Sequence, residues 1–346
     1  MKTFRFVHAT FGLWVAIMLI SVSVQANVWR VNNRSGVDAD FTSIMQAHQS
    51  SLVQNGDTLY VEGSSASHGD VTLSKKLVII GPGYFLAENP ETQADHNPAV
   101  MTTLTLNPGS EGSIIKGCKM QNVIINASDI IFKSNRVKNT AVSKSVELGG
   151  NINNIIIRNN YIHQSWISQG AKTIAAEENG TNNVLIQNNY IFMGSTLSTR
   201  FSLFLLDGFS GEIVNNMIYG NAIVNNTQFH NNIFRRGSFS ADNTNITHNI
   251  ANQDQFGNQN GNQQNVDMDD VFVDPDGEST DGRWQLSPTS PALGAGVEGT
   301  DIGMFGGEYP YRLSGLPRIP SIYEINHTIN YENQTLEVEF SVKTNN

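Results

Sequence analysis

One repeated pattern constrains the fold more than any other feature: an apolar residue, two further residues, an asparagine, one more residue and a second apolar residue. It is plain in "IIIRNNYIHQS" (155–165) and again in "VLIQNNYIFMG" (184–194). Repetition of a unit of this size along a chain is typical of solenoids. The repeated asparagines are Asn135, Asn160, Asn189, Asn216, Asn232 and Asn249, and Cys118 takes the equivalent place upstream.

Each repeat is interpreted as a strand, a bend and a second strand. Side chains two residues apart in a strand face the same way, so Ile155 and Ile157 point inward and Ile162 resumes the inward row after a bend at Asn160. Asparagine tolerates left-handed backbone and bonds backbone groups at bends. Parallel coils stack about 4.8 Å apart, so successive asparagines are expected to form a hydrogen-bonded ladder. The pattern therefore predicts an all-β solenoid in which each coil covers its neighbour's apolar row.

Three segments resemble the right-handed parallel β-helix proteins of the pectin-lyase-like superfamily: "DFTSIMQAHQSSLVQNGDTLYVEG" (40–63), "KKLVIIGPGYF" (75–85) and the closing stretch 269–307. This resemblance implies about ten right-handed coils and a short N-terminal helix that plugs the open end. The expected apolar face of that helix is Phe41, Ile44, Met45 and Leu52. The superfamily includes lyases, hydrolases and adhesins, so the resemblance specifies fold and leaves activity open.

The beginning of the chain reads as a secretory signal. Lys2 and Arg5 precede an apolar run that ends in a small-residue cleavage site at Ala26. We therefore expect a signal peptide at 1–26 and a secreted bacterial protein, periplasmic or extracellular, with no transmembrane anchor after cleavage.

Two further segments are expected: a β-helix domain at 27–307 and a short β tail at 308–346. The tail has Pro317 and Pro320, then two alternating strand patterns. Two strands are too few to be stable alone in water. We expect them to lie against the last coils or to begin a β-sandwich that this chain does not complete.

Composition excludes some partners. The net charge of −10 argues against nucleic acid, because no stripe of lysine and arginine is evident to replace phosphate counterions. Acidic polysaccharides would be repelled unless calcium or a local basic patch intervenes. A single cysteine excludes an internal disulfide framework.

The repeat spacing singles out three long coils. Successive repeat positions, from Cys118 through the six repeated asparagines to Asn249, are separated by 17, 25, 29, 27, 16 and 17 residues. Three coils therefore carry roughly 8–12 extra residues each, and in solenoids such insertions often form the binding face. Longer strands and a wider cross-section are the alternative. The predicted binding region is 138–212.

Charged residues recur within this region. Glu147, Glu177 and Asp207 are spaced by 30, and Lys144, Lys172 and Arg200 by 28. A column of acids would place carboxylates about 5 Å apart, a separation that suits a retaining glycosidase or a calcium ion. In a lyase, Lys172 or Arg200 would stabilise the enolate. An ordinary solvated face is the alternative, so the catalytic candidates are Glu147, Glu177, Asp207, Lys172 and Arg200, and Ca²⁺ is the only cofactor considered.

Aromatic residues offer a second kind of site. Tyr161 and Tyr190 occupy matching positions that should face outward, with Trp166 close by, and together they would present rings to a sugar. Aromatic residues also simply favour strands. His163 is a candidate acid or base, with a surface histidine as the alternative.

Acidic pairs and loops give little support for an enzyme. The aspartate groups typical of pectate lyases and polygalacturonases are missing, and the adjacent pair Asp269–Asp270 belongs to the closing stretch. The stretch "DPDGESTDG" resembles a calcium loop but lacks the EF-hand spacing, so a turn is the alternative. Its acidic residues are Asp274, Asp276, Glu278 and Asp281.

The predicted function is binding of an extracellular glycan or cell-surface partner through 138–212. The rival is a polysaccharide lyase or glycoside hydrolase on the same face, and the third alternative is a passive scaffold. A groove lined by the charges above would favour an enzyme. A flat, aromatic or Asn/Thr-rich face would favour binding or scaffolding.

Overall fold

The computed structural model describes residues 26–165, 168–273, 277 and 279–345. The predicted signal peptide up to residue 25, Trp166, Asp274, Asp276 and Glu278 lie outside these residues. No helix within the described part of the chain is long and apolar enough to cross a membrane.

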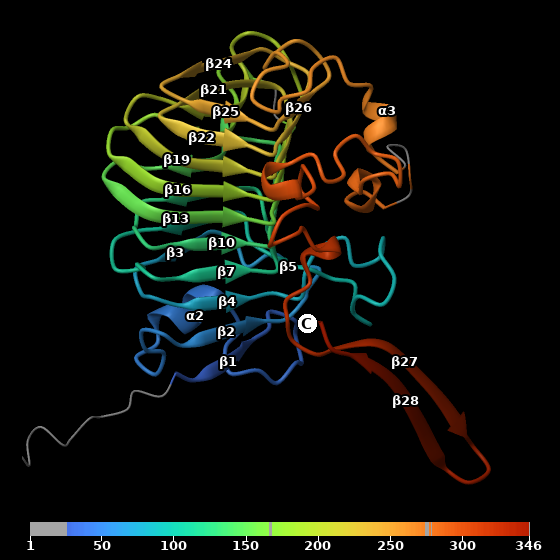
Figure 1. Ribbon diagram of the computed structural model, residues 1–346. Helices are drawn as coiled ribbons and strands as arrows, with labels where there is room; N and C mark the ends of the chain where they lie inside the picture. The colour runs from blue at the N-terminus through green and yellow to red at the C-terminus, as the bar shows by residue number, and fades with distance from the viewer. Residues whose placement is uncertain (1–25, 166–167, 274–276, 278, 346) are drawn as a thin grey trace, which may run out of the picture.

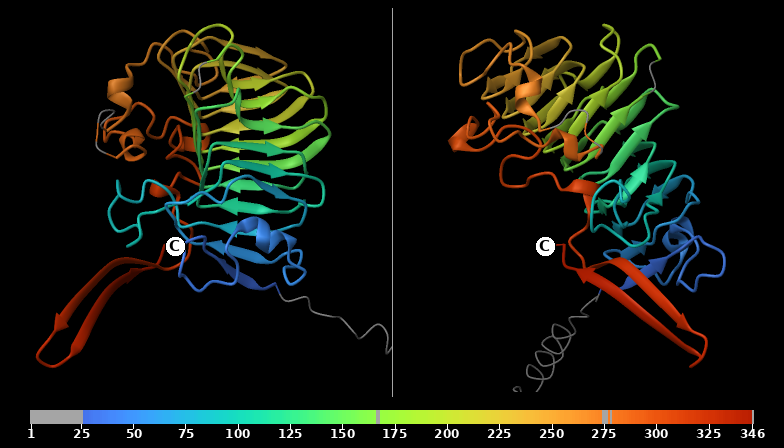
Figure 2. Two further views of the ribbon diagram at one scale, coloured as in Figure 1. Left: turned by 180° about the vertical axis from the view of Figure 1, so that it is seen from behind. Right: turned by 90° about the vertical axis from the view of Figure 1, so that its right-hand side faces the viewer.

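The chain winds into a right-handed parallel β-helix with three sheets (Figures 1 and 2), as predicted. Within the described residues, sheet I has ten strands: β1 (Val28–Val31), β2 (Thr58–Val61), β4 (Val78–Ile80), β7 (Ile114–Lys116), β10 (Ile131–Lys133), β13 (Ile152–Arg158), β16 (Thr181–Gln187), β19 (Phe209–Val214), β22 (Thr227–His230) and β25 (Asn245–Thr247). Neighbouring strands in this sheet are parallel, and each belongs to a successive coil.

Sheets II and III complete each coil. Sheet II contains β5 (Ala99–Val100), β8 (Cys118–Met120), β11 (Arg136–Asn139), β14 (Tyr161–Gln164), β17 (Tyr190–Met193), β20 (Met217–Tyr219), β23 (Ile233–Arg235) and β26 (Ile250–Ala251). Sheet III contains β3 (Val71–Leu73), β6 (Thr103–Leu106), β9 (Asn122–Ile125), β12 (Lys144–Leu148), β15 (Lys172–Ala176), β18 (Phe201–Leu205), β21 (Asn221–Asn225) and β24 (Phe239–Asp242). A coil thus passes from sheet I to II to III.

The corner between sheets I and II holds a continuous asparagine ladder. The amide oxygen of Asn189 accepts from the Asn160 backbone N–H at 2.9 Å and from the Asn160 side-chain amide at 3.0 Å. The Asn189 side-chain amide donates to the Ile157 carbonyl and to the Asn216 side-chain oxygen. The same contacts continue through Asn135, Asn216, Asn232 and Asn249. Each rung satisfies backbone groups that the bend would otherwise leave unpaired inside the protein.

The ladder extends one rung beyond the repeat pattern. Asn262 accepts from the Asn249 backbone N–H at 2.9 Å, and at the other end the Cys118 N–H donates to the Asn135 side-chain oxygen. Gly261 and Gly117 precede these two end residues, and both have positive φ. The sequence pattern misses Asn262 because Gln259 and Gln264 stand where it requires apolar residues.

The left-handed bend belongs to the first asparagine of each pair, which corrects the expectation that the ladder residue makes it. Asn159, Asn188 and Asn215 have φ of 56°, 53° and 55°. Their side chains point outward and hold the C-terminal segment: the Asn188 amide donates to the Met304 and Gly306 carbonyls at 3.0 and 2.7 Å. The two asparagines of each pair therefore have different roles. The first turns the chain and binds the C-terminal segment, and the second forms the ladder.

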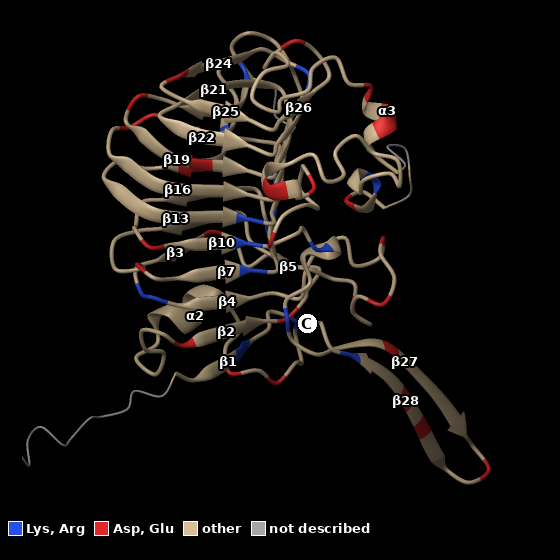
Figure 3. Ribbon diagram, in the orientation of Figure 1, with Lys and Arg blue, Asp and Glu red and all other residues tan. Residues whose placement is uncertain are grey.

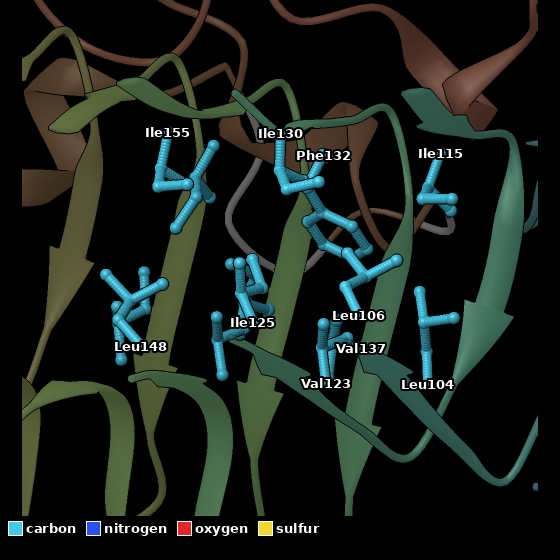
Figure 4. Close-up of a cluster of buried hydrophobic side chains, with 14 of the residues drawn as sticks. Leu104, Leu106, Ile115, Val123, Ile125, Ile130, Phe132, Val137, Leu148 and Ile155 are labelled. Atoms are coloured by element: carbon cyan, nitrogen blue, oxygen red, sulfur yellow. The ribbon is translucent and has the colours of Figure 1, made fainter. Parts of the chain in front are cut away.

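The inward rows of the three sheets form one apolar core along the solenoid. Figure 4 shows part of it. Phe132 is fully buried and stacks in register between Ile115 and Ile157 of the adjacent coils. Full burial of such a side chain stabilises the fold by about 1.5–3 kcal/mol.

A short helix, α2 (Ile44–Gln49), caps the first coils. The Ser43 hydroxyl accepts from the Gln46 N–H and caps its N-terminus. Ile44 is fully buried, whereas Leu52 is 63% exposed, so its assignment to the apolar face is wrong. The helix ends before Leu52, which places that side chain in the following turn.

After β26 the chain returns along the outside of sheet II (Figure 1). This segment contains α3 (Met268–Val271), η1 (Gly282–Trp284), η2 (Val297–Gly299) and η3 (Leu313–Gly315). It forms a second apolar cluster with outward side chains of sheet II.

The tail forms an antiparallel hairpin of β27 (Ser321–Asn330) and β28 (Thr335–Lys343) that projects away from the solenoid (Figures 1 and 2). Its base contacts the loop before β5: the Ala94 N–H donates to the Ile322 carbonyl, and Lys343 pairs with Glu91. The expectation that the tail lies against the last coils is therefore wrong.

Candidate functional site

The extra residues of the long coils both lengthen the strands and form longer loops, which are the two alternatives expected from the sequence. The strands of sheet I lengthen from three residues in β10 to seven in β13 and β16. The connections from β14 to β15 and from β17 to β18 also lengthen, whereas Gly220 alone joins β20 to β21. The long coils are therefore wider and also carry loops.

Four of the predicted charges form an ion-pair network at sheet III: Lys144, Glu147, Lys172 and Glu177. Lys144 and Lys172 are in register on adjacent strands. The Lys144 Nζ lies 2.6 Å from Glu147 Oε1 and 2.6 Å from Glu177 Oε2, and the Lys172 Nζ lies 2.7 Å from Glu177 Oε1. The Lys172 ammonium also lies 4.3 Å from the centre of the Phe204 ring.

The expected acidic column does not form. Ala175, not Glu177, is in register with Glu147. Asp207 lies beyond the end of β18 and accepts from the Asn225 side-chain amide. Arg200 does not continue the pair of Lys144 and Lys172, because Phe201 is in register with Lys172. The Arg200 guanidinium instead donates to the Ser195 hydroxyl.

The network favours the ionised form of Glu177 and the protonated form of Lys144. Partial burial alone would raise the pKa of Glu177, but hydrogen bonds to Lys144 and Lys172 lower it below its usual value. Partial burial alone would lower the pKa of Lys144, but hydrogen bonds to Glu147 and Glu177 raise it. A general acid needs a raised carboxyl pKa and a lysine base a lowered one, so these shifts run against acid–base catalysis.

The two predicted tyrosines match in position but are buried. Tyr161 and Tyr190 are in register, and their rings stack with centres 4.3 Å apart. Only 5% and 3% of their surfaces are exposed, because Trp284 of the returning segment covers Tyr190. Burial raises the pKa of Tyr161 to about 12. The expectation of aromatic faces open to a sugar is wrong for this pair.

His163 packs on sheet II instead of standing free on the surface. Its ring lies edge-on to Phe192 with centres 4.4 Å apart. Burial, with smaller contributions from Lys138 and Arg136, lowers the pKa of His163 to about 4. The imidazole is therefore neutral at physiological pH.

The lowered pKa of His163 predicts that acid destabilises the folded protein. In the unfolded chain His163 titrates near pH 6.5, so lowering the pH from 7 to 5 protonates the unfolded state and destabilises the fold. We expect wild type to lose about 1–2 kcal/mol more than His163→Phe over this interval. Urea unfolding at the two pH values measures the difference, and equal losses in both proteins would contradict the assignment.

A hollow of about 650 Å³ opens on the outer face of sheet I in the long coils. Gly211 helps to form it, because the register between β16 and β19 shifts and a Cβ at Gly211 would lie 2.1 Å from the Val184 carbonyl oxygen. We call this hollow the amide groove. Its lining is Asn154, Ile156, Asn182, Asn183, Val184, Leu185, Ser210, Gly211 and Glu212.

Polar groups in the amide groove are arranged by short contacts. The Asn183 amide donates to the Asn154 side-chain oxygen at 2.6 Å, and the Ser210 hydroxyl donates to the Asn182 side-chain oxygen at 3.0 Å. At the edge, Glu212 Oε1 lies 2.9 Å from His230 Nε2. Amides and a hydroxyl offer both donors and acceptors, and Ile156 and Leu185 provide aliphatic surface between them. None of the candidate catalytic charges lines this groove.

Asp281, the described member of the predicted calcium loop, has a structural role. It is fully buried, and its two oxygens accept from the Asn89 amide, the Tyr311 hydroxyl and the Ser314 N–H at 2.9, 3.1 and 2.7 Å. These bonds tie the returning segment to the loop after β4. Among the described residues, no three His, Cys, Asp or Glu side chains lie close enough together to hold a metal ion.

Comparison with protein families, curated proteins and solved structures found no match for this chain.

Proposed function

We propose that this protein is exported by a bacterium and binds an extracellular glycan in the amide groove of its long coils. The observation that carries the proposal is the lining of the groove, where side-chain amides, a hydroxyl and aliphatic groups converge on a hollow. Small apolar surfaces with a few placed polar groups are typical of ligand sites. The three segments of sequence described above, together with the coil architecture, also support membership of the pectin-lyase-like superfamily as part of this proposal.

The ion-pair network on sheet III supports binding over catalysis. Each Glu177 carboxylate oxygen is paired with an ammonium group, which disfavours a role as proton donor or free nucleophile. A lyase or hydrolase on that face would need at least one of these groups released from its partners.

A panel of neutral and acidic polysaccharides, each with and without calcium, tests the proposal. We expect retention of a hydroxyl-rich glycan on a column or in a gel, with no unsaturated products and no new reducing ends. Product formation that is abolished by Glu177→Gln would establish the enzyme instead. Absence of retention on every polysaccharide would favour the passive scaffold.

A pair of matched variants locates the binding. Asn182 and Asn153 are in register on adjacent strands and both are exposed, but only Asn182 lines the groove. Loss of one hydrogen bond costs about 0.5–1.5 kcal/mol, so Asn182→Ala should weaken glycan affinity about 2- to 10-fold. Asn153→Ala should leave the dissociation constant unchanged. Equal affinities for both variants in isothermal titration would place the ligand elsewhere.

A further inference from the structure

A row of basic side chains stands at the end of three successive strands of sheet I. Lys116 ends β7, Lys133 ends β10 and Arg158 ends β13, and the three are in register. Figure 3 shows them as blue strand ends one above another. Parallel strands lie about 4.8 Å apart, so the row presents a cation at each strand spacing along the solenoid axis. Each of these residues stands two positions before a ladder residue in the sequence.

The returning C-terminal segment closes the other side of the row and creates a pocket of about 400 Å³. It contributes Arg312 and Arg318 to the lining, and Ser134 adds a hydroxyl from the sheet side. The Arg158 guanidinium lies over the Tyr309 ring, 4.0 Å from its centre. Because one wall is the solenoid and the other is fixed to it by Asn159 and Asn188, the pocket is held rigidly.

The pocket brings together cations from the sheet and from the returning segment. Within the described part of the chain, no aspartate or glutamate side chain lines the pocket. Among the described residues, no carboxylate forms an ion pair with Lys116, Lys133, Arg158 or Arg318. The Arg158 Nε is buried without a hydrogen-bond partner in the described structure. Glu308 attracts Arg158 electrostatically but forms no ion pair with it.

The local electrostatics are consistent with a site that lacks its counter-charge. Burial, followed by repulsion from Arg158 and Arg318, lowers the pKa of Lys133. Burial and then repulsion from Lys133 lower the pKa of Lys116. Such a cluster is unfavourable in the free protein, and it stands out in a chain whose net charge is −10. An anion in the pocket would relieve the repulsion and accept charge-assisted hydrogen bonds.

We propose that this basic pocket binds a segment of an acidic glycan that presents at least two oxyanion groups along the row Lys116–Lys133–Arg158. The groups are carboxylates, sulfates or phosphates, and the Ser134 hydroxyl is available to the sugar. The pocket is a site additional to the amide groove and does not depend on it. A flexible polyanion with charges on one side suits a one-sided row, and the row is the local basic patch that an acidic polysaccharide needs against a net charge of −10.

Binding of polygalacturonate and of dextran sulfate, with dextran as the neutral reference, tests the proposal and separates carboxylate from sulfate ligands. We expect wild type to bind at least one acidic polymer and not to bind dextran at this pocket. Lys133→Gln should weaken that binding about 3- to 10-fold, which corresponds to the loss of one charge-assisted contact. The matched control is Lys138→Gln, which removes the same charge from an exposed position in the same coil and should change affinity less than 2-fold.

Folding of the variant is checked by its melting temperature without ligand. Lys133→Gln relieves repulsion, so its melting temperature should equal or exceed that of wild type. Asn182→Ala should leave binding of the acidic polymer unchanged, so a failure of the amide groove and a failure of the basic pocket are distinguishable. The proposal is overturned if neither acidic polymer binds, if Lys133→Gln and Lys138→Gln weaken binding equally, or if a single-stranded oligonucleotide binds as tightly and with the same dependence on Lys133.

Discussion

Replacement of Asn189 by alanine should destabilise the protein by about 2–6 kcal/mol. The change removes a fully buried amide from the middle of the ladder. It leaves the Asn160 N–H without its acceptor and the Ile157 carbonyl without its donor. Each buried polar group left unpaired costs about 1–3 kcal/mol, and two such groups give the expected range.

Urea unfolding followed by circular dichroism measures this loss. The control is Asn153→Ala, which removes an exposed amide of the adjacent coil and should change stability by less than about 0.5 kcal/mol. If the two variants were equally stable, the ladder would contribute nothing beyond ordinary surface asparagines, and the interpretation of the repeat would fail.

Phe132→Ala should cost about 3–5 kcal/mol because it opens a cavity in the continuous core. The ring is fully buried and lies between Ile115 and Ile157, so the neighbouring coils cannot close the gap without breaking their own strand pairing. In a solenoid each coil contacts only its neighbours, so the loss should be local.

Hydrogen exchange tests that locality. Protection of β7, β10 and β13 should fall in Phe132→Ala, while protection of the distant β22 and β25 should fall much less. Phe204→Ala is the control, because that ring lies on the outer, half-buried face of sheet III and should cost less than Phe132→Ala. A uniform loss of protection along the whole chain would mean that the fold is a single cooperative unit rather than a stack.

The architecture could be predicted from sequence because its determinants are local and repeated. The spacing of Ile157, Asn160 and Ile162 specifies a strand, a bend and a strand, and the repeat specifies that these units stack. The sequence did not assign the left-handed bend to Asn159, because two adjacent asparagines have the same intrinsic preference and only their surroundings distinguish them.

The candidate sites were harder to predict because they depend on contacts between distant segments. Tyr161 faces out of its strand as expected, but the segment around Trp284 returns from far along the chain and covers the stacked tyrosines. The sequence predicted a column of acids because residues at equal intervals in the sequence were assumed to be in register on neighbouring strands. The coils differ in length, however, so Glu177 and Asp207 lie beyond the strand ends. The row of Lys116, Lys133 and Arg158 contradicts the expectation that the chain has no stripe of lysine and arginine. It was accessible from the sequence, since each of these residues precedes a ladder position by two residues.

The central functional claim, that a glycan occupies the amide groove, is tested most directly by hydrogen exchange of the wild-type protein with and without the neutral glycan retained in the polysaccharide panel. We expect slower exchange in β16 and β19, where Asn182 and Ser210 line the groove, and no change in β12 and β15 of sheet III. Slower exchange confined to β12 and β15, around Lys144 and Lys172, would contradict it and would place the ligand on the ion-pair network.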